Sequence, residues 1–214
     1  YLPAATYRHR FDVDQTPPIS DVYIKATSAD TSPSWRTILV GAQRGGGKGL
    51  FALDVTDPSQ FTEANAASLV LWEFTHADLG YTFSQPIITP MNTTDGDGLY
   101  RWAAIFGSGY NNYDGTTGSG RAKLFIVYLD GGIDGVWTDG SSGSDLDYIV
   151  IDTEVGNTTT QNVLSSPAVL DLDGNGTADR VYAGDLQGNM WAFDISASST
   201  NSWDAAYKTS GKPA

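Results

Sequence analysis

The sequence predicts an all-β fold that is built from about three copies of a four-stranded unit. Glycine is abundant, with 24 residues among 214, and the chain also holds 11 Tyr, 8 Phe and 6 Trp. Aromatic and β-branched residues favour strands, and glycine pairs favour the tight turns between them. A strand that ends in Gly, a Gly-rich turn and a second strand occur together three times. Such a period is typical of a repeat architecture.

The central pair of strands is the clearest part of each copy. In the three copies the first strand of the pair closes on Gly41, Gly107 or Gly184, and a second strand begins after a polar turn. The pairs are residues 37–41 with 50–55, 103–107 with 121–129, and 180–184 with 189–195. Strand-type runs separated by Gly-rich turns indicate antiparallel hairpins.

One further strand is expected on each side of every central pair. The preceding strands are residues 21–24, 84–88 and 166–170, and the following strands are residues 70–74, 147–151 and 202–207. Residues 58–68 carry the main helix signal, enough for one or two turns. Four antiparallel strands per repeat are typical of a β-propeller blade. We therefore expect blades over residues 15–75, 81–153 and 161–214.

The chain is expected to form part of a larger propeller. Propellers close with typically four to eight blades, and about three are present, so residues 1–214 form a partial β-propeller domain. Residues 1–14 are expected to supply the outer strand of a preceding blade. The chain opens at Tyr1 without an initiator Met, which suggests a piece of a longer precursor. The polar, Gly-rich residues 110–120 and 131–145 are expected to be exposed loops.

Charge and composition exclude several classes of function. The formal net charge is −13, which argues against nucleic acid and against anionic membrane surfaces as partners. The chain has no Cys, so a disulfide framework, a thiol nucleophile and a cysteine-ligated metal are excluded. No apolar run approaches the roughly 20 residues that a membrane-spanning helix needs. The acidic balance instead suits a chain that binds cations.

The most informative motif is a nine-residue acidic loop that begins at Asp171. Oxygen-bearing side chains fall at its positions 1, 3, 5 and 9, and Gly176 at position 6 permits a sharp bend. Calcium takes six to eight oxygen ligands at about 2.3–2.6 Å, which a curled loop can supply. The expected ligands are Asp171, Asp173, Asn175, Thr177 through its carbonyl, and Asp179.

The loop differs from the helix-flanked EF-hand motif. Position 12 of that motif is a bidentate Glu, whereas Tyr182 stands there in this chain. The residues on both sides of the loop have the character of strands, so we expect a calcium loop that joins two strands of one blade. The alternative is a polar β-turn that uses Asp, Asn and Gly for their backbone preferences. The charge of the ligand set is −3, and calcium is favoured over magnesium, which keeps more of its water.

With these motifs the chain resembles the propeller domain of the PilY family of type IV pilus biogenesis and tip adhesin proteins. The resemblance is carried by residues 35–42 and 49–58, by residues 106–112 and, most specifically, by residues 166–194, where the acidic loop is fused to the blade repeat. It implies an exported, pilus-associated bacterial protein at the cell surface, in the fimbrium or at the outer membrane. It also implies a non-enzymatic role, with a calcium site at the five residues above that is linked to pilus extension and retraction. The implied partners are pilus subunits (minor pilins) or a host-surface receptor.

Two alternatives rest on parts of the same pattern. The blade repeat is shared with quinoprotein dehydrogenases, which hold a quinone and calcium on the propeller axis, many beside a vicinal cysteine pair that this chain lacks. An absorbance scan for a bound quinone tests that alternative. A glycan-binding propeller would use exposed aromatic side chains, and Trp137 in a Gly-Asp loop is the candidate for such a contact. Trp72, Trp102 and Trp191 lie in strand patterns and are expected to pack between blades.

Other motifs give weaker indications. Residues 45–49 are Gly-rich and contain Lys48, but the spacing does not fit a phosphate-binding loop. The run that begins at Gly107 lacks the third Gly of a dinucleotide fingerprint. His9 and His76 are the only histidines. His9 lies in a strand pattern and is expected to be structural, and neither His has metal-ligand spacing. Residues 92–101 occupy the place of the acidic loop in the second repeat, with broken ligand order, and are expected to be a decayed, metal-free copy.

Overall fold

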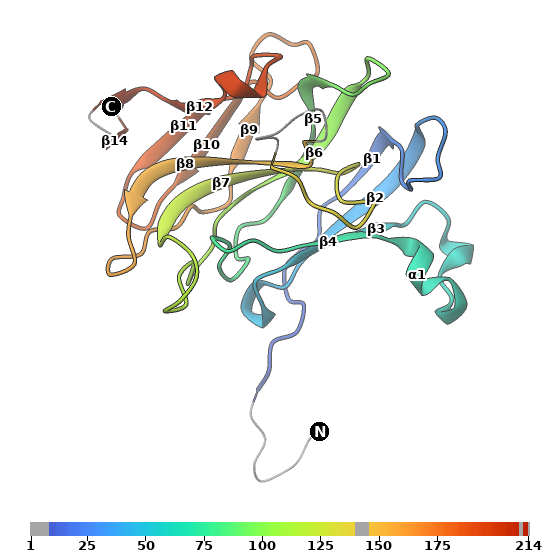
Figure 1. The fold of residues 1–214 in the computed structure, drawn as a ribbon, viewed down its shortest axis with the longest axis horizontal. Coiled ribbons are helices and arrows are strands. Elements are labelled where there is room, and N and C mark those ends of the chain that lie inside the picture. The colour runs from blue at the N-terminus through green and yellow to red at the C-terminus, as the bar shows by residue number, and fades with distance from the viewer. Residues whose placement is uncertain (1–8, 140–145, 210–211, 214) are drawn as a thin grey trace.

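The fold consists of three four-stranded antiparallel sheets that follow one another along the chain. It was obtained as a computed structural model, which describes residues 9–139, 146–209 and 212–213. In each sheet the spatial order of the strands is their order in the sequence, as in a propeller blade. Figure 1 shows the sheets side by side, with the second sheet between the first and the third.

The first sheet holds the expected central hairpin between two outer strands. Its strands are β1 (Ile19–Ile24), β2 (Ser34–Ala42), β3 (Leu50–Asp54) and β4 (Val70–Phe74). Short helical turns fill the connections: η1 (Arg44–Gly46) joins β2 to β3, and η2 (Pro58–Gln60), η3 (Glu63–Asn65) and α1 (Ala66–Leu69) join β3 to β4. The helical turns predicted for residues 58–68 are therefore confirmed.

The second and third sheets repeat this arrangement. The second contains β5 (Ile87–Thr94), β6 (Tyr100–Gly107), β7 (Arg121–Tyr128) and β8 (Tyr148–Gly156). The third contains β9 (Ala168–Leu170), β10 (Arg180–Gly184), β11 (Met190–Asp194) and β12 (Asp204–Ala206), with η4 (Thr200–Ser202) before β12. A small hairpin of β13 (Lys208–Thr209) and β14 (Lys212–Pro213) follows. The predicted repeat of four strands is thus present in all three copies.

Two apolar cores hold the sheets together, one on each face of the second sheet. Successive residues of β6 alternate between them: Ile105 packs in the core shared with the third sheet, and Phe106 packs in the core shared with the first. Phe125 and Ile126 of β7 alternate in the same way. Because side chains of a strand point to opposite faces, a strand buried on both faces must be apolar throughout. This explains the continuous apolar run in β7.

The tryptophans of the strands pack as predicted, whereas Trp137 does not. Trp72 is buried in the core between the first and second sheets, and Trp191 is buried in the core between the second and third. Trp102 is partly buried and packs against the same core as Trp72. Trp137 is also half-buried: its ring lies 4.9 Å from Phe74, and its Nε1 donates a hydrogen bond to the Glu73 carbonyl at 3.1 Å. The prediction of an exposed contact at Trp137 is wrong, because its loop folds back onto the edge strand β4.

The ends of the chain bear on the predicted blade boundaries. Residues 9–14 lie in bends and irregular backbone rather than in the strand expected for residues 1–14, and His9 is exposed there. An outer strand needs a partner blade, and no blade precedes β1 within the described residues. Residues 1–8 lie outside the described residues, as do 140–145 of the loop predicted over residues 131–145. The exact limits of the blades stay a prediction.

His76 gives the fold a pH-dependent contact directly after β4. Its partly buried ring lies 5.3 Å from Phe125 and 5.8 Å from Tyr148, and Nδ1 accepts a hydrogen bond from the Asp78 N–H at 3.0 Å. Burial lowers the pKa of His76, and the Asp78 carboxylate opposes this effect. The folded protein therefore favours the neutral imidazole.

We expect the folded state to lose stability as the pH falls below about 6.5, the ordinary pKa of histidine. The unfolded state binds the proton more readily than the folded state, so acid shifts the equilibrium toward unfolding. A His76→Asn variant removes the titrating ring but keeps a side-chain acceptor. Urea unfolding at pH 7.5 and 5.5 should show a larger loss for the wild type than for this variant. A His9→Asn control should behave as the wild type, and equal losses in all three proteins would contradict the role of His76.

Candidate metal centre

The acidic loop joins two neighbouring strands of the third sheet. It spans residues 171–179 between β9 and β10, and its base is closed by the Asp179 N–H, which donates to the Leu170 carbonyl at 2.9 Å. Gly174 and Gly176 have φ values of +77° and +89°. Residues other than glycine rarely adopt this backbone conformation. The glycines thus give the loop its bends, as predicted for Gly176.

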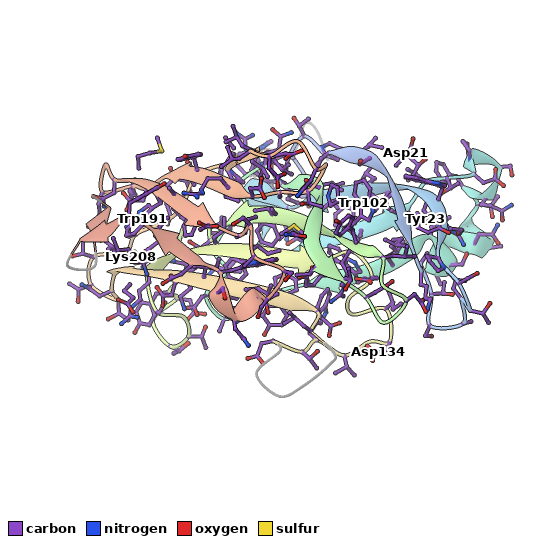
Figure 2. All side chains as sticks on the ribbon, turned by 90° about the horizontal axis from the view of Figure 1, so that it is seen from above. Asp21, Tyr23, Trp102, Asp134, Trp191 and Lys208 are labelled. Atoms are coloured by element: carbon purple, nitrogen blue, oxygen red, sulfur yellow. The ribbon has the colours of Figure 1, made fainter. Side chains whose placement is uncertain are left out.

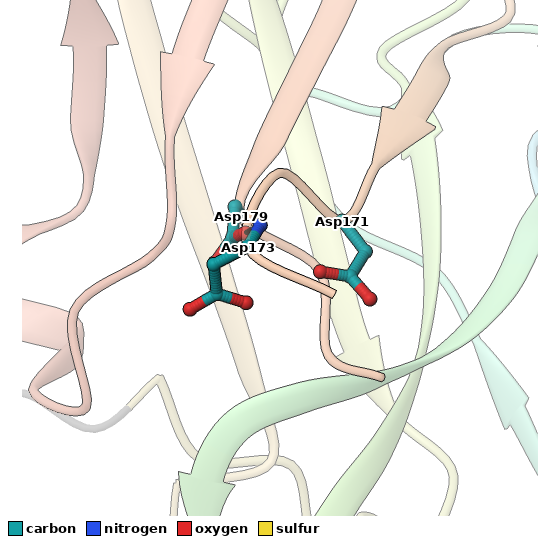
Figure 3. A group of neighbouring side chains, drawn as sticks. All are labelled: Asp171, Asp173 and Asp179. Atoms are coloured by element: carbon teal, nitrogen blue, oxygen red, sulfur yellow. Dashed lines mark hydrogen bonds between the residues drawn. The ribbon is translucent and has the colours of Figure 1, made fainter. Parts of the chain in front are cut away.

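Three carboxylates of the loop converge. Asp171, Asp173 and Asp179 each offer an oxygen, and these atoms all lie within 4.8 Å of one another. Figure 3 shows the three side chains around the loop that follows β9. Two oxygens that bind one calcium ion at about 2.3–2.6 Å are at most about 5.2 Å apart. The spacing therefore fits a shared divalent cation.

Asp179 differs from the other two carboxylates because it is buried. It is only 4 % exposed, and its Oδ2 accepts hydrogen bonds from the N–H groups of Leu172 at 2.7 Å and Asp173 at 3.3 Å. A buried carboxylate needs such partners, since an unpaired buried charge is costly. Asp179 thus holds the backbone of the first half of the loop, and it also belongs to the carboxylate cluster.

Asp171 is exposed and is fixed by backbone donors. Its Oδ1 accepts from the Gly174 N–H at 2.7 Å, and its Oδ2 accepts from the Gly176 N–H at 2.8 Å. The hydrogen bond from Gly176 is the main reason that the pKa of Asp171 lies below its usual value. The carboxylate is therefore held in its charged form, which is the form that binds a cation.

Asn175 and Thr177 belong to the same hydrogen-bond network. The Asn175 Nδ2 donates to Asp173 Oδ2 at 3.1 Å, and the Asn175 Oδ1 accepts from the Thr177 N–H at 2.7 Å. Thr177 is buried, at 1 % exposure. The Thr177 hydroxyl also donates to Asn175 Oδ1, at 2.6 Å. Both lone pairs of this amide oxygen are therefore in use, and Asn175 would exchange one of these hydrogen bonds for a cation. The five predicted ligands are thus linked within one loop.

The end of the loop contacts the second sheet, which the sequence did not indicate. The Ala178 N–H donates to the Pro90 carbonyl at 2.9 Å, and Met91 pairs with Ala178 in an isolated parallel bridge. On its own sheet, the Asp179 carbonyl accepts from the Ile195 N–H at 2.9 Å. The loop is therefore fixed to two blades, and the sequence carries no local signal for a contact between segments so far apart.

The counterpart of the loop in the second sheet is occupied by a lysine. Asp95 Oδ1 accepts from the N–H groups of Asp97 and Leu99, both at 2.9 Å, and the Lys25 Nζ lies 2.7 Å from Asp97 Oδ2. The hydrogen bond with Asp97 is the main cause that raises the pKa of Lys25. A side-chain cation thus pairs with a carboxylate of this loop, and the decayed, metal-free copy stays a prediction.

The remaining sequence motifs have structural roles in the described part of the chain. The turn before Lys48 is the short helix η1, and the Lys48 Nζ donates to the Asn111 carbonyl at 2.6 Å. His76 packs against aromatic rings, as described above. Among the described residues, the acidic loop is the one group of three or more His, Asp or Glu side chains with metal-ligand spacing.

Three four-stranded antiparallel sheets packed side by side, with a candidate metal loop between two strands of the third, define a partial β-propeller. Comparison with known proteins places the chain more narrowly. The family model described as the PilY1 beta-propeller domain matches residues 4–214. The chain therefore belongs to the PilY1 β-propeller family, as its resemblance to PilY proteins predicted.

Individual relatives agree with this assignment. The chain is 39 % identical over 219 residues to a type IV pilus biogenesis factor PilY1 homolog of Xylella fastidiosa, covering 97 % of this chain and 12 % of that protein. It is 35 % identical over 210 residues to type IV pilus biogenesis factor PilY1 of Pseudomonas aeruginosa (strain PAO1), covering 96 % and 15 %. The chain thus spans less than one sixth of the length of these relatives.

A solved structure shows the same fold. The crystal structure of the Pseudomonas aeruginosa PilY1 C-terminal domain superposes with a TM-score of 0.65 and 29 % sequence identity, over 94 % of this chain and 37 % of that chain. The predicted all-β propeller fold is therefore confirmed, and the chain corresponds to part of a larger domain. Among the described residues, the structure contains no helix of the length and apolarity needed to cross a membrane.

Proposed function

We propose that the chain is a calcium-binding, non-enzymatic propeller module of a type IV pilus biogenesis factor. The observation that carries the proposal is the convergence of Asp171, Asp173 and Asp179 within 4.8 Å, in a family whose members are named for pilus biogenesis. Asn175 and the carbonyl of Thr177 would complete the ligand set. The ion would supply positive charge and fix the loop.

The chemistry of the donor set favours calcium over other metals. The proposed ligands are all oxygens, which suit hard cations, and neither Cys nor His stands in the loop. Calcium accepts irregular coordination by carboxylate, amide and carbonyl oxygens, whereas magnesium demands near-ideal octahedral geometry and retains water. A nine-residue loop with mixed donors therefore fits calcium better.

Calcium would stabilise the contact between two blades. Without an ion, the carboxylates of the loop repel one another, and backbone N–H groups offset this repulsion only in part. Binding to the folded form alone stabilises it by about 2.7 kcal/mol at a hundredfold excess over Kd. Because the Ala178 N–H donates a hydrogen bond to the Pro90 carbonyl, this stabilisation would extend to the interface between the second and third sheets.

An Asp173→Ala variant is expected to lose calcium-dependent stabilisation. Asp173 is exposed and accepts only within the loop, from Asn175, so its removal should change the calcium-free stability by less than about 0.5 kcal/mol. Urea unfolding with 1 mM EDTA and with excess calcium, together with calorimetric calcium titration, measures both effects.

Asp134→Ala is the matched control for this measurement. Asp134 is also exposed and accepts from the N–H two residues later, that of Val136, at 2.9 Å. It should keep the full calcium effect. Unchanged calcium binding by Asp173→Ala would contradict the ligand assignment.

The proposed place of action is the type IV pilus at the bacterial cell surface. The partners would be pilus subunits, including minor pilins, or a host-surface receptor, and the calcium loop would regulate pilus function and adhesion. The relatives are named as type IV pilus biogenesis factors, which supports the pilus as the place of action. In a piliated bacterium that makes this protein, replacing it by the Asp173→Ala form should remove the response of surface piliation to calcium. Calcium-dependent piliation that persists with this variant would argue against the regulatory role.

The two alternative functions have less support. Trp137, on which the glycan alternative rested, is packed against Phe74. The quinoprotein alternative shares the blade repeat, but the relatives reported above are pilus biogenesis factors. An absorbance spectrum of the purified protein without a quinone band is the expected result.

A further inference from the structure

An aromatic pocket lies beside the acidic loop and has no part in the proposed calcium binding. It measures about 460 Å³ and opens between the first sheet, the second sheet and the loop. Its lining includes Tyr23, Trp35, Leu99, Tyr100, Trp102 and Gly176. Figure 2 shows Tyr23 and Trp102 on the same part of the molecule. We call this site the aromatic pocket.

Two of its rings are open to solvent. Trp35 is 63 % exposed and Tyr100 is 49 % exposed. The ring of Trp35 lies 5.5 Å from that of Tyr23, so these two rings of the lining adjoin each other. Large aromatic side chains gathered around one opening are a feature of binding sites, because a ligand that covers them removes much apolar surface from water.

The edges of the aromatic pocket are acidic. On one edge, Asp171 Oδ2 accepts from the Gly176 N–H at 2.8 Å, so this carboxylate lies next to the lining. On the other edge, a second pocket shares two tyrosines with the first. Its charged lining consists of three carboxylates and two cations: Asp95, Asp97, Asp130, Lys25 and Arg101. Lys25 pairs with Asp97. Arg101 pairs with Asp130. Within the described ranges, no ion pair involves Asp95 or Asp171, so each edge retains one carboxylate that is not in an ion pair.

A calcium ion in the loop would not reverse this charge. The three loop carboxylates contribute −3, which exceeds the +2 of one calcium ion, so the loop stays acidic in either state. The whole chain has a net charge of −13. The surroundings of the aromatic pocket therefore attract cations with or without bound metal.

The same protein shows how such surroundings hold a guanidinium group. Arg101 lies 3.7 Å from the centre of the Tyr128 ring, and its Nη2 is 2.6 Å from Asp130 Oδ1. Arg180 likewise lies over Tyr207, at 5.4 Å. Arginine is suited to this combination because its planar group stacks on rings and forms paired hydrogen bonds with carboxylates.

We propose that the aromatic pocket binds an arginine side chain of a basic segment in a partner protein. The guanidinium would stack on Trp35 or Tyr100, and its N–H groups would donate to the Asp95 carboxylate at the edge. A neutral sugar could also stack on the rings, but it would gain nothing from the negative charge around them. Charge complementarity therefore favours the cationic peptide.

The test is a titration of the protein with a nona-arginine peptide, in 150 mM NaCl with excess calcium, followed by tryptophan fluorescence and calorimetry. The wild type should bind nona-arginine more tightly than nona-lysine. Trp35→Ala and Tyr100→Ala should each weaken nona-arginine binding by about three- to thirtyfold, the range expected for loss of one cation–π contact. Phe61→Ala is the control, because Phe61 is 51 % exposed and lies outside the aromatic pocket; its affinity should match the wild type.

Three outcomes would overturn the proposal. The first is no binding of nona-arginine by the folded wild type. The second is binding that nona-lysine matches and that Trp35→Ala leaves unchanged, which would show only a general attraction of a basic peptide to an acidic protein. The third is binding of a neutral oligosaccharide, lost in Trp35→Ala, without any preference for arginine.

Discussion

An Asp179→Ala variant is expected to be less stable than the wild type even without calcium, and to show no further stabilisation when calcium is added. Asp179 is buried, and its Oδ2 accepts from the N–H groups of Leu172 and Asp173. Its removal leaves these donors without their partner, which costs about 1–3 kcal/mol. Urea unfolding in EDTA measures the first effect, and repetition with excess calcium measures the second.

This variant separates the two roles of the loop carboxylates when it is compared with Asp173→Ala. Both variants should lose the calcium effect, but only Asp179→Ala should be markedly destabilised in EDTA. An Asp179→Ala protein that equals the wild type in EDTA would show that the backbone hydrogen bonds to this carboxylate contribute little. An Asp179→Ala protein that is still stabilised by calcium would show that Asp179 is not a calcium ligand.

A Trp191→Ala variant is expected to lose about 3–5 kcal/mol of folding free energy, as is usual when a large buried side chain is truncated in a core. Trp191 is fully buried between the second and third sheets, and its Nε1 donates to Asp185 Oδ2 at 2.9 Å. The same carboxylate accepts from the side chains of Asn162 and Asn189. The variant therefore loses core packing and one member of a hydrogen-bond network.

Trp35→Ala is the matched control for this measurement. Trp35 has the same side chain but is 63 % exposed, so its removal should change stability by at most about 0.5 kcal/mol. Equal destabilisation of the two variants would contradict the assignment of the core between the second and third sheets. Chemical unfolding followed by far-UV circular dichroism is suitable, because it does not depend on tryptophan fluorescence.

The strands could be predicted from the sequence because their signals are local. The apolar run of β7, the glycines that end β6 and β10, and Gly41 one residue before the end of β2 indicated the central hairpins of all three sheets. The spacing of oxygen-bearing residues also located the acidic loop, and the structure brings three of the five predicted ligands together. These features depend on residues a few positions apart.

The features that the sequence did not indicate depend on contacts between distant segments. Lys25 forms an ion pair with Asp97 of another blade, and the Ala178 N–H donates a hydrogen bond to the Pro90 carbonyl of the neighbouring sheet. Trp137 lies in a polar loop that suggests exposure, yet its ring packs against Phe74. The burial of Asp179 likewise follows from the packing of the loop rather than from the motif.

The proposed calcium site is tested most directly by a crystal structure determined with excess calcium and with anomalous diffraction data. The expected result is an anomalous peak inside residues 171–179, about 2.3–2.6 Å from oxygens of Asp171, Asp173, Asn175 and Asp179 and from the Thr177 carbonyl. A well-ordered loop with only water among these oxygens, in crystals grown at saturating calcium, would contradict the assignment.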